Sequence, residues 1–344
     1  MASMFSNPRP RPSPETICQN SSTQNLPLHT SDPKTKKQPN LILGLATAVG
    51  AQVIWGVFPV YIKLFDGVID PLDLVAHRVM WSFLVLAIWM AIVSVRSKLA
   101  KADVSGSLAS LRSQISNQPG TVRMSVFAAV VIVTNWLMFV WAIANDHVID
   151  ASLGYYICPQ LVVLLGVVFL KERLTVLQWI AVVLAAVGVS IMTWSANSEI
   201  WIGLVVAIAF AIYALIKKKT QLSATEGLTM ETGFLLLPAI AFMVWRTSVM
   251  GATVMPESIT LSLLLACSGI ATITPLFLYV IAVKHLSLST VGLLQFIGPT
   301  IQFLLGLIVF GDPVDSTRLF GFVFVWIGVT VYLVALRNRS ASSD

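Results

Sequence analysis

Charge is the scarcest property of this chain. Only 11% of its 344 residues are Asp, Glu, Lys or Arg, and 56% are hydrophobic, whereas about a quarter of the residues in ordinary soluble proteins are charged. A soluble protein of this length could not bury so much apolar surface. The charges fall in short clusters between apolar runs of roughly 18–25 residues, the length that spans a bilayer as a helix. We therefore predict a membrane protein with several spans.

Cysteine is also rare, and the common motifs of enzymes and metal sites are missing. Cys18 lies in a polar stretch, and Cys158 and Cys267 lie in apolar runs, which offers no disulfide framework. The chain has no GxxxxGK[ST], HExxH or GxSxG motif and no Cys/His metal spacing. Asp73 and His77 stand one helical turn apart, but no nucleophile accompanies this acid–base pair. We therefore expect no enzyme activity, no cofactor, no metal and no direct use of ATP.

Ten apolar runs are long enough to cross a bilayer as helices. They cover residues 41–64, 72–95, 122–144, 149–170, 174–195, 199–216, 228–250, 259–283, 288–310 and 317–336. Most connections between them are tight, but the connection 96–121 has spaced apolar residues that predict a short amphipathic helix at the membrane surface. Residues 1–40 are rich in Pro, Ser, Thr, Asn and Gln and lack an apolar run. This composition predicts a disordered cytoplasmic tail and not a signal peptide.

Lysine and arginine are nearly absent from one set of connections. The basic residues gather on one predicted side, at Lys34, Lys36, Lys37, Arg96, Lys98, Lys101, Arg112, Arg123, Lys171, Arg173, Lys217, Lys218, Lys219, Lys284, Arg337 and Arg339. The opposite connections carry Asp66, Asp70, Asp146, Asp150, Glu199, Glu257, Asp312 and Asp315. Because basic loops stay in the cytoplasm, both termini are predicted to be cytoplasmic, with Arg246 and Arg318 as minor exceptions. This distribution also explains the net charge of +6, so nucleic acid is not an expected partner.

One segment of the chain occurs twice. Residues 151–159 (ASLGYYICP) resemble residues 289–299 (STVGLLQFIGP), and the two final prolines are 140 positions apart. A duplication of this size in an apolar chain is typical of a transporter built from two structural halves. We assign residues 41–195 and 199–337 to the halves. Five spans per half is an odd number, so the second copy would enter the membrane from the opposite side. The predicted fold is an all-α membrane protein with ten transmembrane helices in a five-plus-five inverted repeat.

Two charged residues lie well inside predicted spans, where a central charge costs about 2.5–3.5 kcal/mol on insertion scales. Arg78 falls in the outer third of its span and Glu231 in the inner third of another. In a ~30 Å hydrocarbon core their depths differ by roughly 15 Å, so we expect no direct salt bridge. We predict two separate polar stations, with Arg78 attracting an anionic group from outside and Glu231 meeting a cation or proton inside. The alternative is that carbonyls, hydroxyls or interfacial water satisfy both residues.

Several further residues near the predicted mid-membrane predict a cavity centred on the repeated segment. With Arg78, the candidate substrate-binding residues are Gln52, Trp55, Asn135, Trp136, Tyr155, Tyr156 and Gln295. Any single one could instead hydrogen-bond between helices. Pro159 and Pro299 recur in both copies and each removes a backbone donor, which predicts helix kinks at the site. A kink that serves only close packing is the alternative.

Taken together, these stretches resemble a known family. The matching segments are Trp55-Gly56 with Pro59 and Lys63, HRVMWS at 77–82, Asn135-Trp136, ASLGYYICP at 151–159, Lys171-Glu172-Arg173 and QFIGP at 295–299. Over roughly residues 41–337 they resemble the RarD-type branch of the EamA family of drug/metabolite transporters. The resemblance implies a ten-span inverted repeat in a bacterial inner membrane, usually outward transport of small metabolites or drugs, and an association with chloramphenicol sensitivity. The chain has Cys158 where the family frequently has Asn, so we carry no binding role to Cys158.

We therefore predict a secondary transporter that exports a small metabolite or drug. A proton gradient is the expected energy source, because Glu231 is the only carboxylate placed well inside a span. An uncoupled facilitative exchanger and a non-transporting membrane scaffold or sensor remain the alternatives. The expected partners are a small-molecule substrate and the lipid bilayer, with a homodimer left open.

Overall fold

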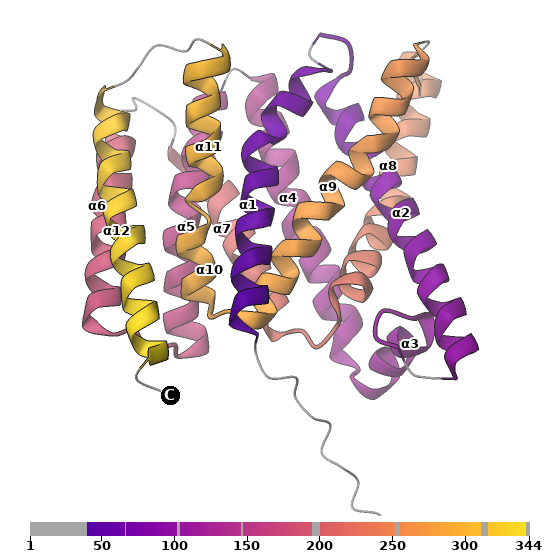
Figure 1. The fold of residues 1–344 in the computed structure, drawn as a ribbon. Helices are drawn as coiled ribbons and strands as arrows, with labels where there is room; N and C mark the ends of the chain where they lie inside the picture. The colour runs from indigo at the N-terminus through magenta and orange to yellow at the C-terminus, as the bar shows by residue number, and fades with distance from the viewer. Residues whose placement is uncertain are drawn as a thin grey trace, which may run out of the picture. The chain divides into compact units, whose positions relative to one another are not determined.

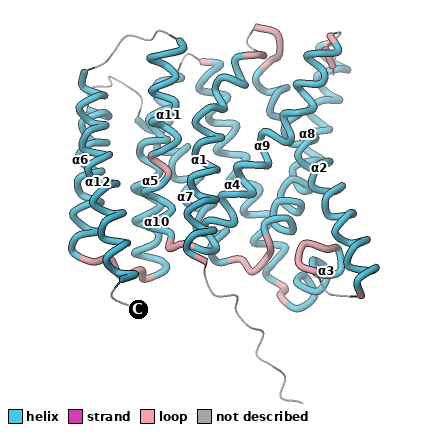
Figure 2. Tube along the Cα trace, in the orientation of Figure 1, coloured by secondary structure: helices cyan, strands magenta, loops and turns pink. Residues whose placement is uncertain are grey.

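Helices make up nearly all of the chain that the structure describes. This computed structural model describes residues 40–65, 67–101, 104–145, 147–194, 200–251, 255–256, 258–310 and 316–341, and these residues contain no strand. The helices are α1 (Leu41–Lys63), α2 (Pro71–Ala100), α3 (Leu108–Asn117), α4 (Gly120–Ala144), α5 (Val148–Leu170), α6 (Val176–Trp194), α7 (Ile200–Lys219), α8 (Ala224–Met250), α9 (Ile259–His285), α10 (Leu288–Leu294), α11 (Ile297–Leu305) and α12 (Ser316–Ala341), with a π-helical turn (Gly306–Phe310) after α11 (Figures 1 and 2).

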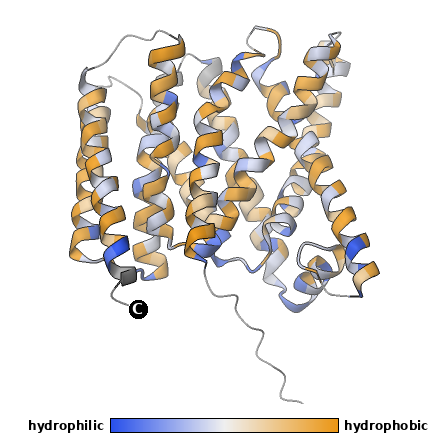
Figure 3. Ribbon diagram, in the orientation of Figure 1, coloured by the Kyte–Doolittle hydropathy of each residue, from blue (hydrophilic) through white to orange (hydrophobic). Residues whose placement is uncertain are grey.

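The ten predicted spans are confirmed. Within the described residues, ten helical segments are long and apolar enough to cross a membrane, and α10, α11 and most of the π-helical turn form one of them, Leu288–Val309. Such helices satisfy their backbone hydrogen bonds internally, which the hydrocarbon core requires. Apolar residues cover most of the spans, and hydrophilic residues gather towards the lower end and around α3 (Figure 3). The start of α1 and the end of α12 lie at that same lower end, as an even number of spans requires (Figure 1).

The connection after the second span contains the predicted short helix, which is α3. Ser107 caps α3 by accepting a hydrogen bond from the backbone N–H of Ser110 at 3.1 Å. The connection is fastened to α8 because the backbone N–H of Gly106 donates to Glu226 at 3.0 Å. Helix α8 begins four residues before its predicted start, since Ser223 and Glu226 form a capping box that satisfies its first backbone donors. The polar character of this first turn hid it from a prediction based on apolar runs.

Gly188 and Gly328 let neighbouring helices approach closely. A Cβ on Gly188 would lie 2.5 Å from the carbonyl oxygen of Gly321, and a Cβ on Gly328 would lie 2.6 Å from that of Ala181. Both contacts join α6 to α12, which pack along much of their length. In lipid, the hydrophobic effect does not drive helices together. Small residues at such interfaces instead allow the close van der Waals packing that holds the helices.

The main helix pairs form matched sets. Helix α1 packs on α9 as α7 packs on α4, and α5 packs on α7 as α11 packs on α1. Likewise α2 contacts α9 while α8 contacts α4, and α2 contacts α8, α5 contacts α10 and α6 contacts α12. Each helix of the first half corresponds to the span that comes five spans later, and replacing every helix by its counterpart gives the same list of pairs. A duplicated unit predicts this agreement. The inverted relation of the halves stays a prediction.

The turn between α9 and α10 is held by polar groups from three other segments. Glu172, just after α5, accepts hydrogen bonds from the backbone N–H groups of Leu288 and Ser289 at 2.6 and 2.9 Å and from the Ser289 hydroxyl at 2.6 Å. Lys218 of α7 donates to the carbonyl oxygens of Val283 and Leu286 at 2.8 and 2.5 Å. The backbone N–H of Asn40 donates to Nδ1 of His285 at 3.1 Å. Glu172 therefore caps a helix that belongs to the other half of the chain.

Some predictions fall on residues outside those that the structure describes. They are the tail 1–40 except Asn40, the loop residues Asp66, Asp146, Glu199, Glu257, Asp312 and Asp315, and the side chains of Asp150, Arg318 and Arg339.

Candidate functional site

Arg78 lies among helices α1, α2, α4 and α9. Its Nε donates to the hydroxyl of Thr272 on α9 at 2.8 Å. Its guanidinium carbon lies 4.9 Å from the ring centroid of Phe58 on α1 and 5.3 Å from that of Trp136 on α4. Both distances suit cation–π attraction. Arg78 and Trp136, two of the predicted binding residues, are therefore in direct contact.

No described carboxylate pairs with Arg78. The described ion pairs join Lys217 to Glu231, and Arg246 to Asp70 and Asp73. Tyr155, another predicted binding residue, lies within electrostatic range of Arg78 and packs edge-on against Phe139 at 5.5 Å. Arg78 is thus a cation inside a span. Its contacts among the described residues are one hydroxyl and two aromatic rings.

A second cluster surrounds Trp55. Its ring lies 5.6 Å from that of Phe210 and 5.5 Å from that of Tyr279, between centroids. The Tyr279 hydroxyl accepts a hydrogen bond from Nε2 of Gln295 at 2.8 Å. The sulfur of Cys158 lies 3.8 Å from Oε1 of Gln295. The predicted residues Trp55 and Gln295 therefore belong to one buried cluster, in which the two copies of the repeated segment touch.

The remaining predicted binding residues lie in helix interfaces. Nδ2 of Asn135 donates to the carbonyl oxygen of Val206 at 2.8 Å, which joins α4 to α7. Tyr156 packs edge-on against Phe322 of α12 at 5.6 Å. At the contact of α1 with α11, a Cβ added to Gly298 would lie 2.8 Å from the amide oxygen of Gln52. The eight predicted residues are therefore spread over two clusters and several helix interfaces, and the cavity that they were expected to line stays a prediction.

Glu231, the predicted coupling residue, is buried with two polar partners from α7. It forms an ion pair with Lys217, and it accepts a hydrogen bond from the Tyr213 hydroxyl at 3.0 Å. The side chains of Lys217 and Glu231 are only 1% and 5% exposed. By sequence, Lys217 belongs to the basic run 217–219 and is expected at the surface, so its burial is a correction. Lys217 and Tyr213 are four residues apart and so reach Glu231 from one face of α7.

Arg246 is explained by its partners. Its Nε and Nη2 donate to the two carboxylate oxygens of Asp73 at 3.0 and 2.8 Å. Its Nη2 also lies 3.4 Å from a carboxylate oxygen of Asp70. A cation at the acidic side of the protein is stabilised by these two carboxylates, and Asp73 is engaged in a bidentate pair.

The two repeated prolines sit in different helix geometries. Pro159 lies inside the continuous helix α5, whereas the second copy is interrupted at Gln295 and Phe296, between α10 and α11, just before Pro299. At the contact of the copies, a Cβ on Gly292 would lie 2.8 Å from the Pro159 carbonyl oxygen. The break is therefore a feature of the second copy alone.

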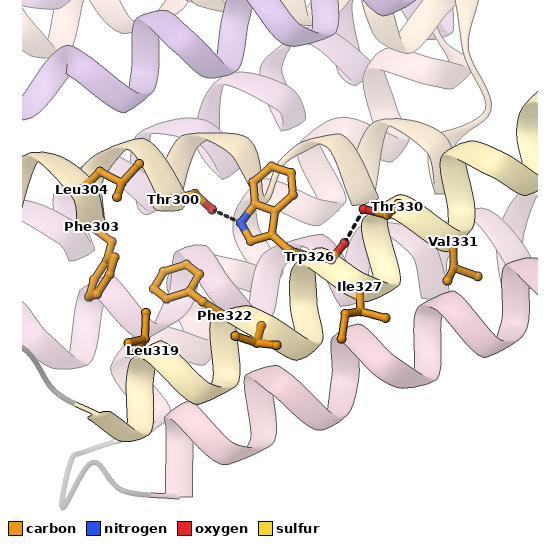
Figure 4. Close-up of a pocket in the computed structure, with 10 residues that line it drawn as sticks. Thr300, Phe303, Leu304, Leu319, Phe322, Trp326, Ile327, Thr330 and Val331 are labelled. Carbon is orange, nitrogen blue, oxygen red and sulfur yellow. Dashed lines mark hydrogen bonds between the residues drawn. The ribbon is translucent and has the colours of Figure 1, made fainter.

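One apolar groove lies beside the predicted residue Tyr156, which packs against its lining residue Phe322. It has a volume of about 580 Å³ and runs between α11 and α12, lined by Thr300, Phe303, Leu304, Leu319, Phe322, Val323, Trp326, Ile327, Thr330 and Val331 (Figure 4). Its two hydroxyls are engaged, because Thr300 accepts from Nε1 of Trp326 at 3.1 Å and Thr330 donates to the Trp326 carbonyl at 2.8 Å. The groove is apolar and contains none of the predicted binding residues. The described residues also include no group of three or more His, Cys, Asp or Glu side chains suited to a metal ion.

Comparison with known proteins identifies the family of this chain. The EamA-like transporter family matches residues 42–194. An uncharacterized transporter of Vibrio cholerae is 35% identical over 87% of this chain and 95% of its own length. Protein RarD of Escherichia coli is 36% identical over 85% of this chain and 94% of its own length. A solved crystal structure, 16% identical, shares the fold with a TM-score of 0.63 over 86% of this chain and 98% of that one. The chain therefore belongs to the EamA-like transporter family, with the RarD proteins among its relatives.

Proposed function

We propose that this membrane transporter exports a small metabolite or drug across a bacterial inner membrane and uses the proton gradient to do so. The family is one of transporters and not of enzymes. The outward direction of transport, its coupling to protons and the location in the inner membrane are our proposals. The basic residues at the end of the bundle shared by the start of α1 and the end of α12 support cytoplasmic termini. The matched helix pairs support two equivalent halves, which we propose to be inverted.

The buried pair of Glu231 and Lys217 carries the proton-coupling proposal. A carboxylate held away from water is stable in its charged form only while a cation and hydrogen-bond donors face it. Lys217 and Tyr213 supply these groups from α7, and Lys284 of α9 lies within electrostatic range of Lys217 and of Glu226. Uptake of a proton by Glu231 would remove the ion pair between α7 and α8. Proton binding would therefore favour a different packing of these two helices, which is what coupling requires.

We propose the substrate path between the Arg78 cluster and the Trp55 cluster. Gln52, Trp55, Arg78, Trp136, Tyr155 and Gln295 would contribute to it. Asn135 and Tyr156 would instead hold helices together, because Asn135 donates to a backbone carbonyl of α7 and Tyr156 packs on α12, outside both clusters. Pro159 and Pro299 would shape the two central helices that bound this path.

The test begins with cells that have or lack the gene. The metabolite whose external level depends on the gene is then used with the protein reconstituted in vesicles. Transport should follow an imposed proton gradient and should fall at least roughly tenfold when the gradient is dissipated. Glu231→Gln should lose the response to the gradient but keep exchange of substrate for substrate. Lys219→Gln, which removes an exposed charge at the end of the partner helix α7, is the control.

Each alternative has its own outcome in these vesicles. Substrate exchange that ignores the proton gradient in the wild-type protein would identify an uncoupled exchanger. Absence of any gene-dependent metabolite, together with absence of exchange, would favour a non-transporting scaffold or sensor.

A further inference from the structure

Arg78 is a cation inside the bundle with no counter-charge among the described residues. Its recorded contacts are Thr272, Phe58 and Trp136, on three different helices. By contrast, Arg246 holds two carboxylates and Lys217 holds one. Lys217 and Arg246 thus face carboxylates, whereas Arg78 faces no described anion.

The guanidinium of Arg78 also has hydrogen-bond donors that its described contacts do not use. Thr272 uses Nε, and the described residues offer no hydrogen-bond acceptor to either Nη group. Arg78 is only partly buried, whereas its partner Thr272 is 2% exposed. Neither Nη group is among the described side-chain atoms that are both fully buried and without a hydrogen-bond partner, so packing does not close off this edge. A planar fork of N–H donors fits a carboxylate through two parallel hydrogen bonds.

The surroundings of this fork favour a particular kind of ligand. Phe58 and Trp136 hold the cation by their ring faces. Tyr155 lies within electrostatic range of the cation and packs edge-on against Phe139. Aromatic walls favour a flat apolar body. A single cation balances a single negative charge, and burial penalises any charge left over.

We propose that Arg78 is the head-group subsite for a small organic monoanion, a carboxylate on a flat apolar body. This assignment rests on the proposed transport function for its biological meaning but not for its chemistry. Thr272 positions the guanidinium through Nε, and Phe58 and Trp136 fix its plane. The Nη edge then receives the carboxylate, whose apolar body lies against the aromatic rings.

The purified full-length protein in lipid nanodiscs provides the test. Benzoate and indole-3-acetate are titrated calorimetrically beside their neutral amides, benzamide and indole-3-acetamide. The acids should bind and raise the unfolding midpoint, and the amides should bind about 10- to 100-fold more weakly, the loss expected when a charged hydrogen bond is removed. This comparison needs no variant. Equal binding of acid and amide, or no binding of either acid at millimolar concentration, would overturn the proposal.

Variants then locate the head group. Arg78→Gln should lower acid affinity by about 10- to 100-fold, while Arg78→Lys, which keeps the charge but loses the fork, should fall between it and the wild type. Lys219→Gln removes one exposed positive charge and should bind as the wild type does. The unfolding midpoint of each variant without ligand reports its folding. Unchanged acid binding by folded Arg78→Gln or Arg78→Lys would contradict the assignment.

This experiment separates the subsite from the transport function. Acids that bind at Arg78 in a protein that moves no substrate in vesicles would refute the transport proposal alone. Proton-driven transport of a neutral metabolite that is unaffected by Arg78→Gln would refute the subsite alone.

Discussion

At the residue scale, the charged side chains inside the spans meet three different environments. Glu231 has a buried cation and a phenol, Arg246 has two partly exposed carboxylates, and Arg78 has a hydroxyl and aromatic rings. The cost of a charge in hydrocarbon makes each of these environments informative. Counter-ions stabilise Glu231 and Arg246, whereas Arg78 has no described counter-ion and is the residue that we propose to bind a ligand.

The buried pair predicts strong non-additivity between two substitutions. Replacing only Lys217 or only Glu231 leaves the other group unpaired, which should destabilise the protein by about 3–5 kcal/mol. The double variant Lys217→Met/Glu231→Gln leaves no charge and should recover most of that loss. Reversible unfolding in detergent would measure the three free energies. Additive losses would mean that the two groups do not stabilise each other.

The sequence identified which charged residues are unusual, but it did not identify the groups that they contact. Arg78 and Glu231 stand out because charges are rare in apolar runs. Lys217 was hidden in a basic run whose neighbours Lys218 and Lys219 do not share its burial. The pairing of Arg246 with Asp73 joins residues 173 positions apart, and a single sequence carries no signal for such a distance. Asn135 was grouped with cavity residues because an amide in a span looks the same whether it binds a substrate or a helix.

At the element scale, helix ends and glycine contacts organise the bundle. The predicted spans match the helices within a few residues wherever apolar character and helix coincide. They fall short at α2, α8 and α12, each of which has a polar end that is still helical. The interruption between α10 and α11 was also beyond reach, because the first copy carries a proline at the matching position and remains continuous.

Glu172 should stabilise the first turn of α10. A carboxylate that accepts from two backbone N–H groups at a helix start both caps the helix and interacts with its dipole. Glu172→Gln should lower the unfolding free energy by about 1–2 kcal/mol. It should also speed hydrogen exchange at Leu288 and Ser289. Exchange rates at these two amides that match the wild type would show that the cap is dispensable.

The α6–α12 interface should reject added side chains. Gly188→Ala and Gly328→Ala would each place a methyl group against a backbone carbonyl, which should destabilise the protein by about 1–3 kcal/mol. Gly120→Ala is the matched control, because nothing lies within 4 Å of its added Cβ. Thermal unfolding of the three variants would compare them. A control as destabilised as the other two would point to a general effect of the substitution.

At the scale of the whole molecule, the membrane topology follows from few features. Span count was predictable from apolar run length, and sidedness was predicted from the distribution of lysine and arginine. The helix pairings could not be predicted, because the spans are too similar in composition to specify their neighbours. The matched pairs nevertheless agree with the division into halves that the repeated segment suggested.

Cysteine labelling should report the orientation. In a variant without native cysteines, Val68→Cys lies in the connection between α1 and α2, and Ser105→Cys lies in the connection before α3, both at exposed positions. With cytoplasmic termini, a membrane-impermeant maleimide should label position 68 in intact cells and position 105 only after permeabilisation. The reverse pattern would invert the proposed topology.

The contact between the two copies of the repeated segment has a mechanical consequence. Helices α5 and α10 cross so closely there that a Cβ added to Gly292 would lie 2.8 Å from the Pro159 carbonyl oxygen. The sulfur of Cys158 and the amide of Gln295 add a second contact beside it. Helices joined at one crossing can still tilt about it, and tilting that separates them at one end brings them together at the other. The crossing can therefore act as a pivot, so that an opening towards one compartment closes the route to the opposite one.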